Sequence, residues 1–189
     1  MTGKAIIVCA PSGAGKTSIV KHLLAGLPQL SFSVSACSRP KRGNETEGKD
    51  YYFMSADEFR ARVQRGDFVE WEEVYPGSYY GTLKSELERI WLEGRVPVFD
   101  VDVKGGLSLK TWFGSDALAI YIKPPSVEAL ENRLKNRGTE TEETLRKRIE
   151  RAEFELGFAG KFDFAIINDN LERACKDAVE AITGFLEKK

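Results

Sequence analysis

The chain has 189 residues, which is enough for one well-buried core and too few for two ordinary domains of about 100 to 200 residues each. Its 28 basic and 29 acidic residues give a net charge of −1, so we expect no nucleic-acid polymer as a partner, because such binders usually carry a positive field. A single histidine excludes Ser-His-Asp and histidine-metal chemistry, and the spacing of the three cysteines predicts reduced thiols.

The chain opens on a short apolar run, Ala5 to Ala10, that leads into a glycine-rich loop. This run is far shorter than a membrane span or the apolar region of a signal peptide, so we expect a strand, no membrane partner and a cytoplasmic protein. Three later segments, "VPVFDV", "ALAIYI" and "FAIIN", share its continuous apolar character. Such runs are typical of strands that are buried on both faces of a parallel sheet.

Helical patterns separate these strands, and they end at or before glycine or proline. We expect helices over Lys16 to Gly26, Leu83 to Glu93, Val127 to Arg137 and Leu171 to Leu186, the last with Asn170 as its N-cap. Strands that alternate with helices indicate an α/β fold with three α/β/α layers and a mostly parallel sheet.

Residues 33–82 interrupt this alternation. A basic loop precedes a short strand, a helix that begins at the capping box Ser55-x-x-Glu58, and the alternating segment "DFVEWEEVYPGSYYGT". The pattern predicts an antiparallel lobe over 33–82, inserted into a core made of residues 1–32, 83–137 and 159–189 of a single domain. The strongly charged residues 138–158 are expected to form a helical lid.

The stretch "CAPSGAGKTS", from Cys9 to Ser18, nearly matches the phosphate-loop (P-loop) pattern G-x-x-x-x-G-K-[ST]. A loop between a buried strand and a helix N-terminus directs backbone N–H groups and the positive end of the helix dipole at one point, which favours phosphate. Gly13 and Gly15 give the backbone freedom to curl, Lys16 supplies a charge, and the Thr17 hydroxyl can hold Mg²⁺.

Ala10 stands where this pattern has its first glycine. The alternative interpretation is an ordinary helix that opens with Gly-Lys-Thr by chance, but the position of the loop between strand and helix favours phosphate. Ala10 is tolerable if it keeps a negative φ, and the following Pro11 already favours the extended region.

Further motifs are Ser35 with "RPKR", Tyr51, "VEW", "YYGT", "FDVDVKG", "NRGTETEE" and "IINDNL". Each has an ordinary explanation when it is taken alone, such as a solvated basic loop or a packed hairpin. Their order and spacing together resemble those of guanylate kinases over nearly the whole chain. The resemblance implies a P-loop enzyme with an ATP site in the core, an inserted GMP-binding lobe and a lid.

The resemblance also implies which residues bind GMP. Those expected to hold its phosphate are Arg39, Arg42, Tyr51 and Tyr80, and those expected around the guanine are Ser35, Glu70, Thr82 and Asp100. The chemistry agrees, because guanidinium groups pair with phosphate oxygens, and a carboxylate accepts from the N1–H and 2-amino donors of guanine. Adenine presents the opposite pattern at that edge, so a preference for GMP or dGMP is expected.

On the ATP side, the resemblance implies the loop residues and two residues near the adenine: Ala10, Pro11, Ser12, Gly13, Ala14, Gly15, Lys16, Thr17, Ser18, Arg133 and Asn168. It implies catalytic roles for Lys16, Arg137 and Arg148, which would neutralise charge on the transferring phosphoryl group. Mg²⁺ is expected with ATP, held by Thr17, with Asp102 acting indirectly. No general base is needed, because the acceptor phosphate is already deprotonated at neutral pH.

Besides Ala10, the chain departs from the family pattern in three places. It has Ala36-Cys37-Ser38 where a threonine-rich stretch is usual, a longer hairpin at Tyr75 to Ser78, and Lys104 where glutamine is usual. Lys104 follows Asp100 and Asp102 closely, and we expect it to form an ion pair with one of them.

Three alternative functions would use the same residues differently. A guanylate-kinase-like binding module would be expected to lose the phosphate loop, which this chain keeps. A GTPase is suggested only by the weak D-x-x-G match at Asp102, with no N-K-x-D motif. A kinase for another nucleoside monophosphate would accept a base other than guanine. We expect an ATP-dependent GMP kinase of purine nucleotide metabolism, acting as a monomer or a small homo-oligomer.

Overall fold

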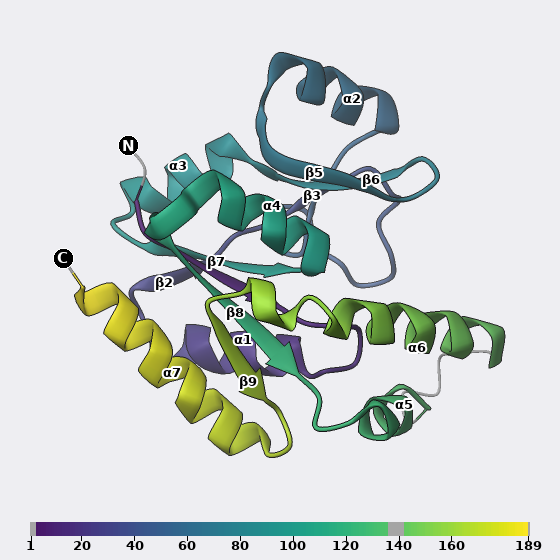
Figure 1. The fold of residues 1–189 in the computed structure, drawn as a ribbon. Coiled ribbons are helices and arrows are strands. Elements are labelled where there is room, and N and C mark those ends of the chain that lie inside the picture. Colours follow the sequence, from purple (N-terminus) through teal and green to yellow (C-terminus); the bar gives the residue numbers. More distant parts are fainter. Residues whose placement is uncertain (1–2, 136–141, 189) are drawn as a thin grey trace.

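The structure, a computed structural model, describes residues 3–135 and 142–188, and within them five parallel strands form the central sheet (Figure 1). In spatial order these are β2 (Leu30–Phe32), β7 (Val96–Val101), β1 (Ala5–Cys9), β8 (Ala117–Lys123) and β9 (Phe164–Ile167). The four predicted strands are confirmed. The strand β2 was not predicted, because three residues are too few to show a pattern.

Two layers of helices cover this sheet, which explains why its strands are apolar throughout. α1 (Lys16–Gly26) and α7 (Leu171–Glu187) pack on one face, and α3 (Lys84–Leu92) and α4 (Val103–Phe113) pack on the other (Figure 1). Alternate residues of β1 enter different layers, since Ile6 and Val8 face the first pair and Ile7 and Cys9 the second. The predicted α/β/α architecture is confirmed.

The helix α4 was not predicted, and its sequence explains why. Gly105 and Gly106 stand in its first turn, and glycine is a poor helix former. Gly106 is needed because a Cβ there would overlap Cys9 Sγ on the neighbouring strand β1. Asp102 caps the helix by accepting a hydrogen bond from the Gly105 N–H at 2.9 Å. These contacts place the start of α4 directly after the carboxyl end of β7.

A second, four-stranded sheet has the spatial order β4 (Tyr52–Phe53), β3 (Ala36–Cys37), β6 (Ser78–Leu83) and β5 (Phe68–Tyr75) within the described residues. The pairs β3–β6 and β5–β6 are antiparallel, as expected, whereas β3 and β4 run parallel. α2 (Ala56–Arg65) covers it, and Ser55 caps that helix as predicted. We call this sheet with α2 the lobe; the boundaries of the core, the lobe and the lid stay predictions.

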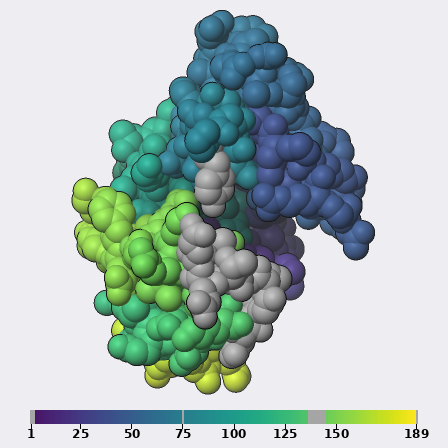
Figure 2. Space-filling view, turned by 90° about the vertical axis from the view of Figure 1, so that its right-hand side faces the viewer, coloured from purple at the N-terminus to yellow at the C-terminus, as the bar shows by residue number. Residues whose placement is uncertain are grey.

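Two further helices lie beside the end of β8. α5 (Val127–Lys135) and α6 (Glu142–Leu156) pack through Leu130, Leu134 and Ala152. Short 3₁₀ turns at Gly114–Asp116 and Ala159–Lys161 complete the described elements. In Figure 2 the lobe (blue) overhangs the green part of the molecule that contains α5 and α6, and the surface between them is hollowed. No helix of the described chain is both long enough and apolar enough to cross a membrane.

Candidate active site

The loop between β1 and α1 has the backbone that a phosphate site requires. Gly13 and Gly15 have φ values of 92° and 93°, which side-chain-bearing residues rarely adopt, and a Cβ on Gly15 would overlap the Asn168 amide. Among the described residues only glycines have a positive φ. Ala10 therefore has a negative φ, and the backbone does not require a glycine at that position. The departure from the motif at Ala10 therefore leaves the loop geometry intact.

A cavity of about 400 Å³ opens at this loop, and we call it the first cavity. Its lining includes every predicted loop residue from Ala10 to Ser18, with Val74, Asp100, Asp102, Arg148, Arg151 and Glu155. The Lys16 ammonium group lies 2.8 Å from Asp100 Oδ1 and also donates to the Val101 carbonyl oxygen. The Thr17 hydroxyl donates to Asp100 Oδ2 at 3.2 Å. Backbone N–H groups, a lysine and a hydroxyl thus converge as binding of a phosphate chain requires.

Arg133 and Asn168 support the loop from behind and do not line the first cavity. The Asn168 side-chain amide, which is buried, donates to the Ala14 carbonyl oxygen at 2.7 Å. Arg133 donates to the Asn168 carbonyl oxygen at 2.8 Å and to that of Ala14 at 3.4 Å. Both residues therefore fix the shape of the loop, and their predicted contact with adenine stays a prediction.

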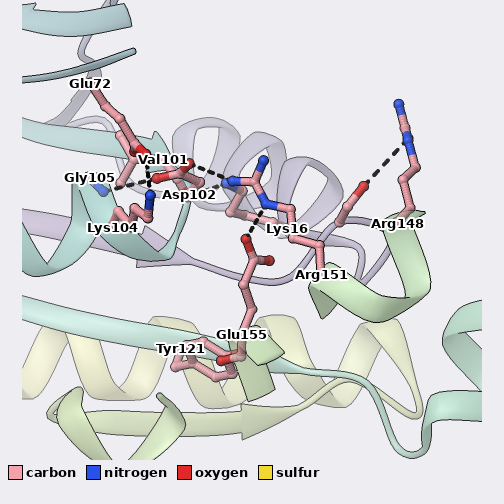
Figure 3. A network of polar contacts seen from close by, with 11 residues as sticks. Lys16, Glu72, Val101, Asp102, Lys104, Gly105, Tyr121, Arg148, Arg151 and Glu155 are labelled. Atoms are coloured by element: carbon pink, nitrogen blue, oxygen red, sulfur yellow. Dashed lines mark hydrogen bonds and ion pairs between the residues drawn. The ribbon is translucent and has the colours of Figure 1, made fainter. Parts of the chain in front are cut away.

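Helix α6 brings two arginines to the first cavity. Arg148 lines it as predicted and donates to Ser12 Oγ at 3.5 Å. Arg151, three residues further along the same helix face, was not predicted; it donates to Asp102 at 2.9 Å and to Glu155 at 2.7 Å (Figure 3). Burial raises the pKa of Glu155, which the Arg151 hydrogen bond opposes. The third predicted arginine, Arg137, lies outside the described residues.

A second cavity, of about 200 Å³, lies between the lobe and the core. It contains five of the predicted base-site and phosphate-site residues, Ser35, Tyr51, Glu70, Tyr80 and Asp100, together with Glu72, Val74, Gly81, Val101, Asp102 and Gly105. Thr82 is fully buried behind it and donates to Glu70 Oε1 at 2.8 Å. Burial raises the pKa of Glu70 to about 7; the Thr82 hydrogen bond lowers it, and the Asp102 and Glu72 charges raise it.

The carboxylates of the second cavity differ in their partners. Asp100 pairs with Lys16, Asp102 with Arg151, and Glu72 with Lys104. Among the described residues, Glu70 has no cationic partner and accepts only from Thr82. A carboxylate that is held in place but not neutralised is suited to accept hydrogen bonds from a ligand with adjacent N–H donors.

Arg39 lies beside the second cavity and not in its lining. It is buried, its guanidinium group stacks over the Tyr51 ring at 4.9 Å, and its Nε donates to the Tyr80 hydroxyl at 3.0 Å. Glu45 holds the same guanidinium group through two hydrogen bonds of 2.7 and 2.5 Å and accepts from the Arg42 backbone N–H at 2.8 Å. Arg39, Tyr51 and Tyr80 are therefore brought together as expected, with Arg42 on the same loop.

Asp100 and Asp102 line both cavities, so the end of β7 is their common wall. Asp102 is occupied by the N-cap and by Arg151, and its indirect role toward a metal stays a prediction. The Thr17 hydroxyl and the Asp100 carboxylate face the first cavity together, and oxygen donors of this kind fit Mg²⁺, which protein sites bind through few carboxylates plus substrate phosphates.

The expected ion pair of Lys104 with Asp100 or Asp102 is wrong. Its ammonium group lies 2.9 Å from Glu72 Oε1 on β5, and Asp102 turns toward Arg151 (Figure 3). Asp100 pairs with Lys16 instead. Lys104 consequently joins the core to the lobe. Glu72 stands two residues after the predicted Glu70, and that spacing on a strand is the signal that would have placed it on the same face.

The sequence matches the family model of guanylate kinase over residues 2–184. It is 50% identical to the guanylate kinase of Bacteroides fragilis, with 97% of this chain and 90% of that protein covered. It is 48% identical to the guanylate kinase of Porphyromonas gingivalis, with 98% and 99% covered. The crystal structure of guanylate kinase from Anaplasma phagocytophilum matches all of this chain and 88% of that chain, with a TM-score of 0.79 and 26% identity.

Proposed function

Because the chain belongs to the guanylate kinase family, we propose that it transfers the γ-phosphoryl group of ATP to GMP or dGMP, giving ADP and GDP or dGDP. The observation that carries this proposal is the common wall of the two cavities. A phosphate loop opens on one side of Asp100, and the half-buried acceptor Glu70 lies on the other. Two nucleotides held there would meet at their phosphates.

The first cavity is proposed to hold the phosphates of ATP. The N–H groups at the start of α1 and the Lys16 ammonium group would bind the β- and γ-phosphates, with Asn168 and Arg133 fixing the loop behind them. Mg²⁺, held by Thr17 and Asp100 with the ATP oxygens, would neutralise charge on the β- and γ-phosphates. Arg148 of α6 and Arg137, which is outside the described residues, would stabilise charge on the phosphoryl group as it moves.

The second cavity is proposed to hold GMP. Glu70, which Thr82 holds from behind, would accept hydrogen bonds from N1–H and the 2-amino group of guanine, while Ser35 supplies a hydroxyl and Asp100 a second carboxylate. The GMP phosphate would bind to Arg39, Arg42, Tyr51 and Tyr80. Arg39 is already oriented by Glu45 and by the two tyrosines, so little side-chain entropy is lost when the phosphate binds.

The acceptor in this reaction is a phosphate oxygen that is ionised at neutral pH, so the chain needs no proton acceptor at the reacting atom. Its residues have three tasks: to bring the two phosphates into line, to neutralise the charge between them and to exclude water. Movement of α6 and the lobe toward each other would complete the site and protect ATP from hydrolysis.

The experiment that tests the proposal measures ADP formation with Mg-ATP and each of GMP, dGMP, AMP, UMP, CMP and dTMP. Turnover with GMP or dGMP alone, lost in Lys16→Ala, is the expected result. Turnover with another monophosphate would contradict the proposed base recognition. A folded protein without turnover on any acceptor would contradict the enzyme and favour a binding module.

A further inference from the structure

The strand β5 has a partner strand on one side only. It is the last strand of the lobe sheet, and its backbone pairs with β6 and with no strand of the central sheet within the described chain. Its position over the core is therefore set by side chains. Val69, at its start, packs against the apolar cluster of α3 and α4. Further along, Glu72 reaches the first turn of α4, where it pairs with Lys104 at 2.9 Å (Figure 3).

Glu70 and Glu72 share one face of β5. Their pairing with Thr82 and Tyr80 of β6 is regular from Glu70 to Glu73, so residues two apart point the same way, and both line the second cavity. The residue after Lys104 meets Glu70 itself, since a Cβ on Gly105 would lie 3.5 Å from Glu70 Oε2. The first turn of α4 thus contacts Glu72 through Lys104 and closely approaches Glu70 through Gly105.

We propose that the Glu72–Lys104 pair is a positioning contact that holds β5 against the first turn of α4 and so aims Glu70 at the guanine of GMP. The inference rests on the proposed function and deepens it. Lys104 is expected to act through Glu72 and Glu70, and not through direct contact with the nucleotide.

The solvent exposure of the Glu72–Lys104 pair distinguishes a role in positioning Glu70 from a role in stabilising the fold. The Lys104 side chain is 73% exposed, and such ion pairs contribute little to the free energy of unfolding. The hydrogen bond to Glu72 raises the pKa of Lys104, so the lysine stays charged through the neutral and mildly alkaline range. Loss of the pair should change the geometry of the GMP site while it leaves the stability of the fold unchanged.

The test compares Glu72→Gln, Lys104→Gln and the double variant in GMP binding by calorimetry and in KM for GMP and for ATP. It is run at pH 8.5, above the Glu70 pKa of about 7, so that altered Glu70 ionisation does not contribute. Glu58→Gln, which breaks the exposed Arg62–Glu58 pair on α2 of the same lobe, is the matched control.

Each single variant is expected to weaken GMP binding about twofold to fivefold, with KM for ATP and the unfolding midpoint as in the wild type and the control. The double variant should bind GMP no less tightly than the single variant of lower affinity, because both substitutions break the same contact. The difference from wild type should shrink in high salt. Single variants that bind GMP like the wild type, or effects that add in the double variant, would overturn the inference.

The same data distinguish a failure of the positioning role from a failure of the proposed function. Normal GMP turnover in all variants, with unchanged GMP affinity, would remove the positioning role alone. If the wild type binds GMP without phosphorylating it, the proposed function fails, and the affinities of the variants still decide the inference. If the wild type binds no GMP, both fail.

Discussion

The ammonium group of Lys16 lies 2.8 Å from Asp100 Oδ1, and the neighbouring Thr17 hydroxyl donates to the other oxygen of the same carboxylate. One side chain at the end of β7 therefore contacts the phosphate loop and lines the second cavity as well. Glu70, by comparison, lines the second cavity alone. Replacement of each carboxylate by the corresponding amide should therefore change the kinetics with ATP and GMP differently for Asp100 and for Glu70.

We expect Asp100→Asn to lower kcat and to raise KM for both ATP and GMP, because the uncharged amide would hold Mg²⁺ less well beside Thr17 and would offer the guanine no second carboxylate. Glu70→Gln should raise KM for GMP about 10- to 100-fold with little change in KM for ATP, as for loss of a hydrogen-bond acceptor that carries charge. Steady-state kinetics with each nucleotide varied in turn distinguishes the two. Identical profiles for both variants would contradict the assignment of Asp100 to both cavities.

The affinity for GMP should depend on pH through Glu70, whose pKa burial raises to about 7. The ionised form predominates above that pKa and accepts from both guanine donors, so affinity should fall about tenfold per unit as pH drops below 7. Calorimetric titration between pH 5 and pH 9 measures this. The GMP phosphate also titrates near pH 6, so Glu70→Gln is the control that retains only the phosphate titration. Parallel curves for the two proteins would exclude Glu70 as the titrating group.

The same pKa has a consequence for stability. The pKa of Glu70 is higher in the folded chain than its ordinary value of 4.5, so its contribution to stability is present below that value and is lost as pH rises through 7. Relative to the wild type, Glu70→Gln should therefore gain up to about 3 kcal/mol in free energy of unfolding between pH 5 and pH 8. Urea unfolding at both pH values measures the gain. An equal difference between variant and wild type at the two pH values would contradict it.

The contact of α4 with β1 predicts a cost for the smallest possible side chain at position 106. Gly106→Ala should lower the free energy of unfolding by about 1 to 3 kcal/mol, because its Cβ would overlap the buried Cys9 sulfur. Adding Cys9→Ala should recover part of the loss. Gly184→Ala, in α7 with no heavy atom within 4 Å of the new Cβ, is the matched control and should be neutral or slightly stabilising. Chemical denaturation of the three variants measures these differences, and a double variant no more stable than Gly106→Ala would contradict the overlap with Cys9.

The support behind the phosphate loop predicts a difference between two substitutions of Asn168. Its amide donates to the Ala14 carbonyl oxygen at 2.7 Å in a buried position, so Asn168→Asp would set two acceptors against each other. This variant should lose about 1 to 3 kcal/mol of stability and raise KM for ATP more than Asn168→Ala does. GMP affinity should change in neither. An aspartate variant with normal KM for ATP would show that the amide does not hold the loop.

The parts of the fold that were predicted correctly have strong local signals. Buried parallel strands leave continuous apolar runs, and the N-caps Ser55 and Asn170 precede their helices as the sequence indicates. α4 was missed because its two glycines serve tertiary packing against β1, and packing between distant segments overrides helix propensity. Its signals were Asp102 as a cap and apolar residues at Val103, Leu109 and Phe113.

The candidate site was predictable where a local sequence motif is specific for one kind of ligand, as the phosphate loop is for phosphate. Three charged residues of the site stand in sequence patterns typical of solvent-exposed positions: Arg151, Glu72 and Lys104. Their partners come from other elements of the fold. No spacing along the chain could show that Lys104 would meet β5 and not an aspartate beside it. Arg39 was expected to bind phosphate, but the sequence offered no sign that Glu45 would hold it.

The position of β1 at the centre of the main sheet has a consequence for the order in which the chain folds. Its neighbours are β7 and β8, with Ile6 beside Val98 and Ala5 beside Ala117, whereas all strands of the lobe lie between Ala36 and Leu83. On the ribosome, the lobe sheet is complete in sequence before either neighbour of β1 has been synthesised. The first strand made therefore stays an unpaired apolar segment at least until Val101 has been synthesised, so the nascent core is exposed to aggregation while the lobe strands can already pair.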